Sequence, residues 1–229
     1  MKKYMLSTLF ILAWVQCASA ATYYVDFGAA NNTTTGNWNN ITANQTGQYI
    51  WPSQSITGLV DANGLQTGGI NLEAVATGTI ANNNDGGSLS PYSTSYPLSA
   101  NQDFIYFDSG DLMTITLSNL NNTLTYDLKL FSSRDASGSR ITQYDLTTGT
   151  IAGSTQRLLE AVDNKGNTVT FASITPDINN EIAFTVQRQS GSSYGYINVL
   201  EITAIPEPGS IALLVLGGLS FFVVLRRRK

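Results

Sequence analysis

Short runs in which apolar and polar residues alternate recur along the chain, and they indicate β-strands with one buried face. In the first run, Tyr23, Val25 and Phe27 fall on one face and Tyr24 and Asp26 on the other. Three further runs place an apolar set on one face in the same way: Met113, Ile115 and Leu117; Tyr126, Leu128 and Leu130; and Ile182, Phe184 and Val186. These runs predict a core built from sheets.

Turn-forming residues separate the runs. Asn119–Asn122 joins the second run to the third. The sequence Asp-Asn-Lys-Gly-Asn at 163–167 separates Leu158–Val162 from Thr168–Phe171, which predicts a hairpin. The pattern therefore favours strands joined by turns over most of the second half of the chain.

The segment Asn31–Asn101 is rich in Asn, Gly, Thr and Ser and shows less periodicity. We expect long loops there. Two short pieces, Ser55–Val60 and Ile70–Ala76, have the composition of strands, and the first is also compatible with a short helix.

Composition between Ala21 and Ile205 supports an all-β domain. Asn, Thr and Ser account for 63 of these 185 residues, and only 21 are charged. Amphipathic helices are rich in Glu, Lys, Leu and Ala, whereas uncharged polar residues suit strands and turns. We expect a single domain at 21–205.

The part from Phe104 to Thr203 resembles the galactose-binding-like jelly roll of many carbohydrate-binding modules. The resemblance depends on Leu124–Ser133 as a central strand and on a closing strand at Tyr194–Ile202. In such folds the closing strand pairs near the first strand, here Tyr23–Phe27. The resemblance implies one jelly-roll-like β-sandwich.

The first twenty residues have the organisation of a secretory signal peptide. Lys2 and Lys3 precede the largely apolar Met5–Val15, and Ala18-Ser19-Ala20 offers small residues to a signal peptidase. Eleven residues are too few to cross a bilayer as a helix, which needs about 20. We expect a signal helix at 1–20 that directs export and is removed.

The composition changes abruptly at the other end, from 206 to 229. Pro206-Glu207-Pro208 is followed by an apolar stretch that ends at Leu225 and then by Arg226, Arg227, Arg228 and Lys229. Gly209–Leu225 has 17 residues, about 25 Å of helix at 1.5 Å per residue, which is the short limit for a transmembrane helix. The basic cluster would stay cytoplasmic and leave the body on the other side.

This C-terminal end resembles the PEP-CTERM sorting signal of exported bacterial proteins. The resemblance covers only 206–229 and implies processing by an exosortase, a membrane enzyme of bacteria that also produce exopolysaccharide. It implies an inner-membrane intermediate held by the C-terminal helix. Removal of the tail near Pro206–Pro208 would follow, with the body at the cell surface or outside the cell.

Charge and missing residue types exclude several functions. The segment Ala21–Ile205 has six basic and fifteen acidic side chains, a net charge of −9, which excludes a nucleic-acid binder. The chain has no His and its single Cys is Cys17, so Ser–His–Asp and Cys–His nucleophiles and zinc sites are excluded. No cofactor is indicated.

Candidate sugar-binding residues are aromatic side chains that could stack on a sugar ring and an arginine that could bind its hydroxyls. They are Trp38, Trp51, Tyr194, Tyr196 and Arg134. The competing interpretation places both tryptophans in the core under long loops. It also makes Arg134, Asp135 and Arg140 solvated residues of a surface loop.

Two further sites follow from the carboxylates. The jelly-roll resemblance implies structural Ca²⁺ between the first and last strands, with Asp26 and Glu201 as candidate ligands. Glycosidases use two carboxylates, and Asp103, Asp108 and Asp111 cluster in what the sequence suggests is a surface turn.

Taken together, these features predict a non-enzymatic protein of the cell surface or extracellular matrix, with signal peptidase and exosortase as processing enzymes and exopolysaccharide as a partner. A carbohydrate-binding module is the alternative, and a small glycan-active enzyme is the third hypothesis.

Overall fold

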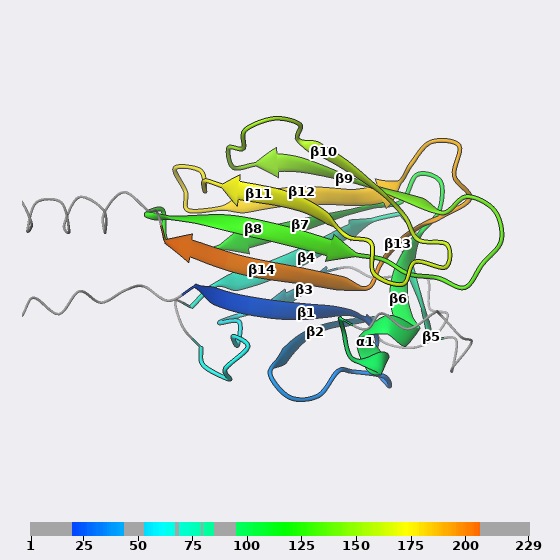
Figure 1. Cartoon of the computed structure of the whole chain (residues 1–229), viewed down its shortest axis with the longest axis horizontal. Coiled ribbons are helices and arrows are strands. Elements are labelled where there is room, and N and C mark those ends of the chain that lie inside the picture. Colours follow the sequence, from blue (N-terminus) through cyan, green and yellow to red (C-terminus); the bar gives the residue numbers. More distant parts are fainter. Residues whose placement is uncertain (1–19, 44–52, 67–68, 79, 85–94, 207–229) are drawn as a thin grey trace, which may run out of the picture. The chain divides into compact units, whose positions relative to one another are not determined.

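The described part of the protein is mostly β-sheet, with one short helix (Figure 1). The computed structural model describes residues 20–43, 53–66, 69–78, 80–84 and 95–206. In spatial order, the first sheet contains β11 (Val169–Ile174), β8 (Leu124–Phe131), β14 (Val199–Pro206), β1 (Ala21–Ala29) and β2 (Trp38–Ala43).

A second sheet has six strands and a third has three. The second contains, in spatial order, β10 (Gln156–Glu160), β9 (Ile141–Thr148), β12 (Ile182–Arg188), β7 (Leu112–Ser118), β4 (Asn71–Thr77) and β3 (Ser53–Ile56). The third contains β13 (Gly195–Ile197), β6 (Asp103–Phe107) and β5 (Ala81–Asn84), and a single turn of helix, α1 (Leu98–Gln102), leads into β6.

The main core lies between the two larger sheets, which pack as a β-sandwich. One cluster of buried side chains includes Val25 and Leu128 from the first sheet and Ile115 and Phe184 from the second. All four predicted alternating runs are confirmed, since the apolar members of each are buried in this cluster. Alternation is thus the feature of the sequence that defines the core.

The predicted pairing of the first and last strands is also confirmed. β14 pairs antiparallel with β1, with Tyr24 opposite Glu201, and on its other side β14 pairs with β8. Figure 1 shows β14 lying between these two strands. An all-β sandwich is therefore established for the described residues, whereas the finer prediction of a galactose-binding-like jelly roll stays a prediction.

The hairpin predicted at 158–171 is wrong. β10 pairs with β9 in the second sheet and β11 pairs with β8 in the first, so the segment between them crosses from one sheet to the other. The turn at Asn119–Asn122 likewise links β7 to β8 across the two sheets. Turn residues mark where a strand ends, but they do not show which strand the chain joins next.

The segment Asn31–Asn101 contains more regular structure than the sequence predicts. Four strands, β2 to β5, and most of α1 fall within it. The strand within Ile70–Ala76 is confirmed as β4, and the helix at Ser55–Val60 is wrong because β3 ends there at Ile56 in antiparallel pairing with β4. Pairing with a neighbouring strand, which local composition does not reveal, stabilises these short segments.

The predicted closing strand Tyr194–Ile202 is divided between two sheets. β13 pairs with β6, whereas β14 pairs with β1 and β8, and the fully buried Asn198 stands between them. The Asn198 carbonyl accepts a hydrogen bond from Phe27 N–H at 2.9 Å, and the Asn198 N–H donates to the Phe131 carbonyl at 3.1 Å. Its backbone thus continues the pairing of the first sheet.

The Asn198 side chain binds the segments around it. Its Oδ1 accepts the Ser133 N–H at 2.9 Å, and its Nδ2 donates to the Asp103 carbonyl at 2.8 Å. These bonds connect the last strand to the loop after β8 and to the first residue of β6. A single buried amide therefore joins the first sheet to the third.

Among the described residues, no helix is both long and apolar enough to cross a membrane. The expected signal helix at 1–20 and the expected transmembrane helix at 209–225 lie outside the described residues, except for residue 20.

We predict that Asn198→Ala lowers the free energy of unfolding by about 3 kcal/mol, because it removes partners from buried backbone groups at Ser133 and Asp103 at roughly 1–3 kcal/mol each. Urea denaturation followed by circular dichroism measures the effect. The exposed Asn63→Ala is the matched control and should stay within about 0.5 kcal/mol of the parent. Equal stability of the two variants would contradict the bridging role of Asn198.

Candidate functional site

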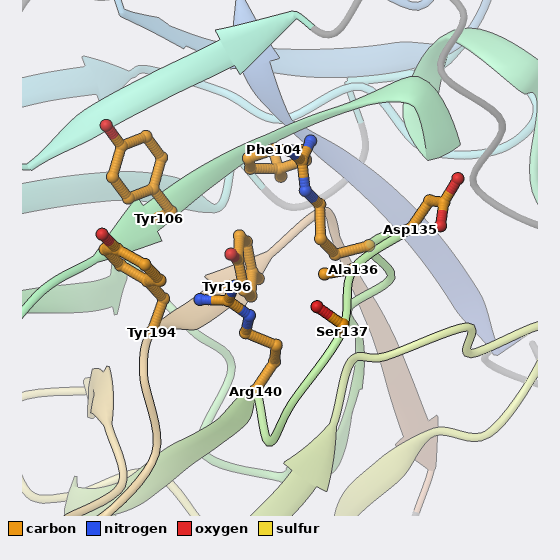
Figure 2. A pocket seen from close by; sticks show the side chains of 9 residues that line it. Phe104, Tyr106, Asp135, Ala136, Ser137, Arg140, Tyr194 and Tyr196 are labelled. Atoms are coloured by element: carbon orange, nitrogen blue, oxygen red, sulfur yellow. The ribbon is translucent and has the colours of Figure 1, made fainter.

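A pocket of about 380 Å³ opens beside the third sheet, between β6, β13 and the loop at 132–140 (Figure 2). Aromatic and cationic side chains make up most of its lining. The lining residues are Phe104, Tyr106, Arg134, Asp135, Ala136, Ser137, Arg140, Tyr194 and Tyr196.

Strand alternation explains why the pocket is aromatic. β6 and β13 pair antiparallel with Tyr196 opposite Tyr106, so these two side chains share a face of the sheet. Phe104 lies two residues before Tyr106 and belongs to the same face. The opposite face carries Ile105 and Ile197, both of which are buried in the main core.

The four rings form a tight group. Tyr196 meets Phe104 edge to face, with ring centroids 5.0 Å apart, and Tyr106 meets Tyr194 in the same way at 5.7 Å. Phe104 and Tyr196 are buried, whereas Tyr106 and Tyr194 are only half-buried. The two half-buried tyrosines therefore form the accessible aromatic surface of the pocket.

Buried hydrogen bonds fix the backbone of Tyr196. Its carbonyl accepts from Thr142 Oγ1 at 2.8 Å and from the Tyr144 hydroxyl at 3.0 Å, and its N–H donates to Thr142 Oγ1 at 2.6 Å. Gly195 allows β13 to pack closely on β12, since a Cβ there would lie 3.0 Å from the Arg188 Cα. The aromatic wall is thus held in place without a ligand.

The loop at 132–140 is also anchored at both ends. The Arg134 N–H donates to the Ala161 carbonyl at 2.8 Å, and Asn164 Nδ2 donates to the Ser132 carbonyl at 2.8 Å. At the other end, the Arg140 N–H donates to Glu160 Oε1 at 2.8 Å. These bonds hold both arginines beside the aromatic rings.

Both guanidinium groups lie over rings of the pocket. The Arg134 Cζ is 4.9 Å from the ring centre of Phe104, and the Arg140 Cζ is 4.8 Å from that of Tyr194. Such cation–π contacts contribute roughly 0.5–2 kcal/mol each. Burial raises the pKa of the Tyr196 phenol above its ordinary value, and the charges of Arg140 and Arg134 act in the opposite direction.

This arrangement suits binding of a ligand that is partly apolar and partly polar. Ring faces offer apolar contact, while guanidinium and tyrosine hydroxyl groups offer hydrogen bonds. Asp135 contributes the one carboxylate of the lining, and Figure 2 shows it directed away from the four rings. The lining therefore provides no pair of carboxylates.

Three of the five predicted sugar-binding residues, Tyr194, Tyr196 and Arg134, come together in this pocket. Trp38 lies elsewhere and stacks on Tyr24 with ring centroids 5.0 Å apart. Trp51 lies outside the described residues.

Phe104 and Tyr106 were not among the residues predicted to bind sugar. A signal for them exists, because Phe104 and Tyr106 repeat the i, i+2 spacing of Tyr194 and Tyr196. Two strands with matching aromatic spacing are candidates to pair through one face.

The predicted sorting residues fall almost wholly outside the described part. Pro206 is the last residue of β14, opposite Leu124 of β8. Glu207, Pro208, Arg226, Arg227 and Arg228 lie outside the described residues.

Comparison with protein families identifies one segment. Residues 204–229 match the PEP-CTERM protein-sorting motif. The match agrees with the resemblance found in the sequence and supports an exported protein that is sorted by an exosortase. A search of curated proteins finds no match.

Among solved structures, the chain is similar to a Phanerochaete chrysosporium exo-β-1,3-galactanase with β-1,3-galactotriose (TM-score 0.32, 14% identity, 68% of this chain and 29% of that one). It is also similar to an arabinose-bound α-L-arabinofuranosidase (TM-score 0.31, 17% identity, 69% and 25%). A third is a family 11 carbohydrate-binding module from Clostridium thermocellum in complex with a β-1,3-1,4-mixed-linked tetrasaccharide (TM-score 0.31, 8% identity, 67% and 95%). The chain spans less than a third of the length of the first two.

The two candidate calcium ligands have different surroundings. Glu201 forms an ion pair with Lys129 at 2.6 Å and accepts a hydrogen bond from the Tyr96 hydroxyl at 3.3 Å. Asp26 Oδ2 instead accepts the Thr34 N–H at 3.0 Å. Within the described ranges, no group of three or more Asp, Glu, Cys or His side chains is arranged to hold a metal ion. Structural Ca²⁺ stays a prediction.

The three aspartates that were expected together in a surface turn differ in how far they are buried. Asp103 belongs to β6 and is fully buried, Asp111 is buried, and only Asp108 is exposed. Asp111 Oδ2 accepts the Asp108 N–H at 2.8 Å, which is a structural role in the turn. The trio does not form an open carboxylate cluster.

Asp103 instead forms a buried pair with Asp26. Its Oδ2 accepts the Ala29 N–H at 2.7 Å and lies over Gly28, where a Cβ would be 1.9 Å from that oxygen. Burial first, and then the charge of Asp26, raises the pKa of Asp103 to about 8. Burial raises the pKa of Asp26 to about 6. Two like charges cannot both remain at this depth, so the pair holds a proton near neutral pH.

We predict that the protein is more stable at pH 5 than at pH 9. The native pair binds its protons more tightly than the unfolded chain, whose carboxyls titrate near 4, so stability is lost as pH rises through about 6 and about 8. The expected fall in melting temperature is about 4 °C or more. In a domain of this size it corresponds to a loss of ~1–2 kcal/mol in the free energy of unfolding.

Scanning calorimetry across this range also tests the assignment to the pair. Asp103→Asn should remove most of the dependence, whereas Asp108→Asn, which changes the same charge at an exposed site, should keep it. A melting temperature that does not fall between pH 5 and pH 9 in the parent protein would show that the pair is not protonated.

Proposed function

We propose that this protein is exported, processed at its C-terminal PEP-CTERM signal and displayed at the cell surface or in the extracellular matrix, where its jelly-roll-like β-sandwich binds carbohydrate without catalysis. The sorting motif at 204–229 supports export and processing by an exosortase. The aromatic pocket supports the binding activity.

The observation that carries the proposal is the placement of Tyr106 and Tyr194 at the pocket surface, backed by the buried Phe104 and Tyr196. Sugar rings have apolar faces that pack on aromatic rings and hydroxyl groups that require donors and acceptors. Tyrosine hydroxyl groups and the two guanidinium groups supply these donors. Backbone bonds to Thr142 and Tyr144 pre-organise the wall, which lowers the entropic cost of binding.

Two features favour binding over hydrolysis. Glycosidases place two carboxylates on either side of the scissile bond, and Asp135 is the one carboxylate that lines the pocket. The carboxyl pair of Asp26 and Asp103 is buried and bound to backbone N–H groups. Non-enzymatic binding thus fits the lining better than glycan cleavage.

Charge and composition suit a hydrated matrix. The segment Ala21–Ile205 has a net charge of −9 and many uncharged polar residues. An excess of one charge sign keeps such a body soluble and separate from its neighbours. The signal peptide expected at 1–20 would direct this body out of the cytoplasm, while the basic tail Arg226–Lys229 would stay on the cytoplasmic side.

We predict that Tyr194→Ala weakens binding of oligosaccharides found on a glycan array by about tenfold or more, because it removes an aromatic contact of roughly 1.5–3 kcal/mol. Isothermal titration measures the affinity. Trp38→Ala is the matched control, since Trp38 is half-buried and packs outside the pocket on Tyr24. Binding that is lost with Trp38→Ala and kept with Tyr194→Ala would place the sugar site elsewhere.

We predict that the mature protein ends near Pro206–Pro208 and begins near Ala21. Mass spectrometry of the protein released from its native host measures both ends. Deletion of Arg226–Lys229 should impair membrane retention before processing, because the cationic tail resists transfer. An intact Lys229 in the released form would contradict exosortase processing.

A further inference from the structure

Two of the six cationic side chains of the body meet in the pocket, although the body is strongly acidic overall. Arg134 lies over Phe104 and Arg140 over Tyr194. Both charges also act on the Tyr196 phenol, which lies between β6 and the loop at 132–140. The pocket is therefore a local cationic site on an acidic protein.

Among the residues that the structure describes, no carboxylate forms an ion pair with the guanidinium of Arg140. The Nε and Nη1 atoms of Arg140 are buried and have no hydrogen-bond partner among the described residues. Glu160 contacts the backbone of Arg140, but its oxygens accept from the N–H groups of Arg140 and Val162 and from the Ser139 hydroxyl. Its carboxylate thus binds two backbone N–H groups and a serine hydroxyl.

Asp135 does not fill this role either. Figure 2 shows the Asp135 carboxylate directed away from the rings, whereas the Arg140 guanidinium reaches toward Tyr194 and Tyr196. A guanidinium that is largely withdrawn from water gains from an anionic partner, because a charge-assisted hydrogen bond is roughly twice as strong as a neutral one. A ligand that enters the pocket can supply that partner.

The chemistry of the arginine side chain also favours an anionic ligand. A guanidinium is planar, binds a carboxylate or a sulfate through two parallel hydrogen bonds, and stacks on aromatic faces. Both arginines are held on rings here, at 4.9 and 4.8 Å, so their positions are set before a ligand arrives. A neutral sugar would leave the charge of Arg140 without a counterpart.

We infer that the ligand is an acidic saccharide, in which a sugar ring packs on Tyr194 and Tyr106 while a carboxylate or sulfate on the sugar is bound by Arg140 and Arg134. This inference rests on the carbohydrate binding proposed above. It goes further by assigning the charge of the ligand and the residues that select it.

The test uses the full-length chain in mild detergent and isothermal titration. The probes are oligosaccharides of alginate and polygalacturonate, their carboxyl-reduced neutral forms, and sulfated galactan oligosaccharides with their desulfated forms. An acidic member should bind at least about tenfold more tightly than its neutral counterpart. The two acidic sets distinguish a carboxylate from a sulfate.

Variants assign the selectivity to the arginines. Arg140→Gln should weaken acidic binding about 10- to 100-fold, which is the range for a hydrogen bond to a charged group, and should weaken neutral binding by less than about tenfold, because only a hydrogen bond to a hydroxyl is lost there. Arg140→Lys should recover only part of the loss, because lysine keeps the charge without the planar fork. Arg134→Gln provides a second variant should the first fail to fold.

Arg157→Gln is the matched control. Its guanidinium lies 5.0 Å from the ring centre of Phe171, a similar stacking contact outside the pocket. Acidic binding should be unaffected by this change. An equal loss in Arg157→Gln and Arg140→Gln would overturn the inference.

The results separate the two proposals. Equal or tighter binding of the neutral forms, still lost with Tyr194→Ala, would overturn the acidic ligand and leave carbohydrate binding intact. No binding of acidic or neutral oligosaccharides, on the array or in titration, would overturn both.

Discussion

The buried amide of Asn198 is the contact on which both the fold and the pocket depend. It stands where the segment Tyr194–Ile202 passes from the third sheet into the first. Backbone bonds to Phe27 and Phe131 keep it in the first sheet, and side-chain bonds to Ser133 and Asp103 hold the neighbouring segments against it.

A buried polar group is stable only when its hydrogen bonds are made. At the break in the strand, the amide of Asn198 satisfies the N–H of Ser133 and the carbonyl of Asp103. It turns Tyr194 and Tyr196 toward β6, where they meet Phe104 and Tyr106 and build the aromatic wall.

Much of the sandwich could be predicted from alternation alone. The four strongest runs each have one fully apolar face, and the hydrophobic effect leaves that face only one stable position, in the core between two sheets. The pairing of the first and last strands was predicted from the resemblance to a jelly roll and is observed between β1 and β14. What local pattern could not predict was the partner of each strand. β10 and β11 flank a turn and still join different sheets, because side-chain packing across the whole domain decides pairing. Short polar strands such as β3 and β5 depend on their neighbours in the same way.

The site was predictable in part, and for a clear reason. Tyr194, Tyr196 and Arg134 stand out as aromatic and cationic residues near turns, and the pocket brings them together. Phe104 and Tyr106 were not recognised because they belong to Asp103–Phe107, where four consecutive large apolar residues suggest buried core positions. Only the register with β13 shows that alternate members of that run face outward.

Asp103 was misjudged for the opposite reason. Its charge suggested a surface turn, but the fold buries it beside Asp26 over Gly28, where the two carboxyls share a proton.

These features describe a β-sandwich whose aromatic pocket is held in place by its own hydrogen bonds, so the location of a bound sugar is the most direct test of the proposed binding. A crystal structure of the protein with an oligosaccharide that binds it should show a sugar ring against Tyr106 and Tyr194. It should also show a polar or charged group of the ligand within hydrogen-bonding distance of the Arg140 guanidinium, with Phe104 and Tyr196 unmoved. A sugar bound instead beside Trp38, or on an open face of either large sheet with the pocket empty, would contradict the account.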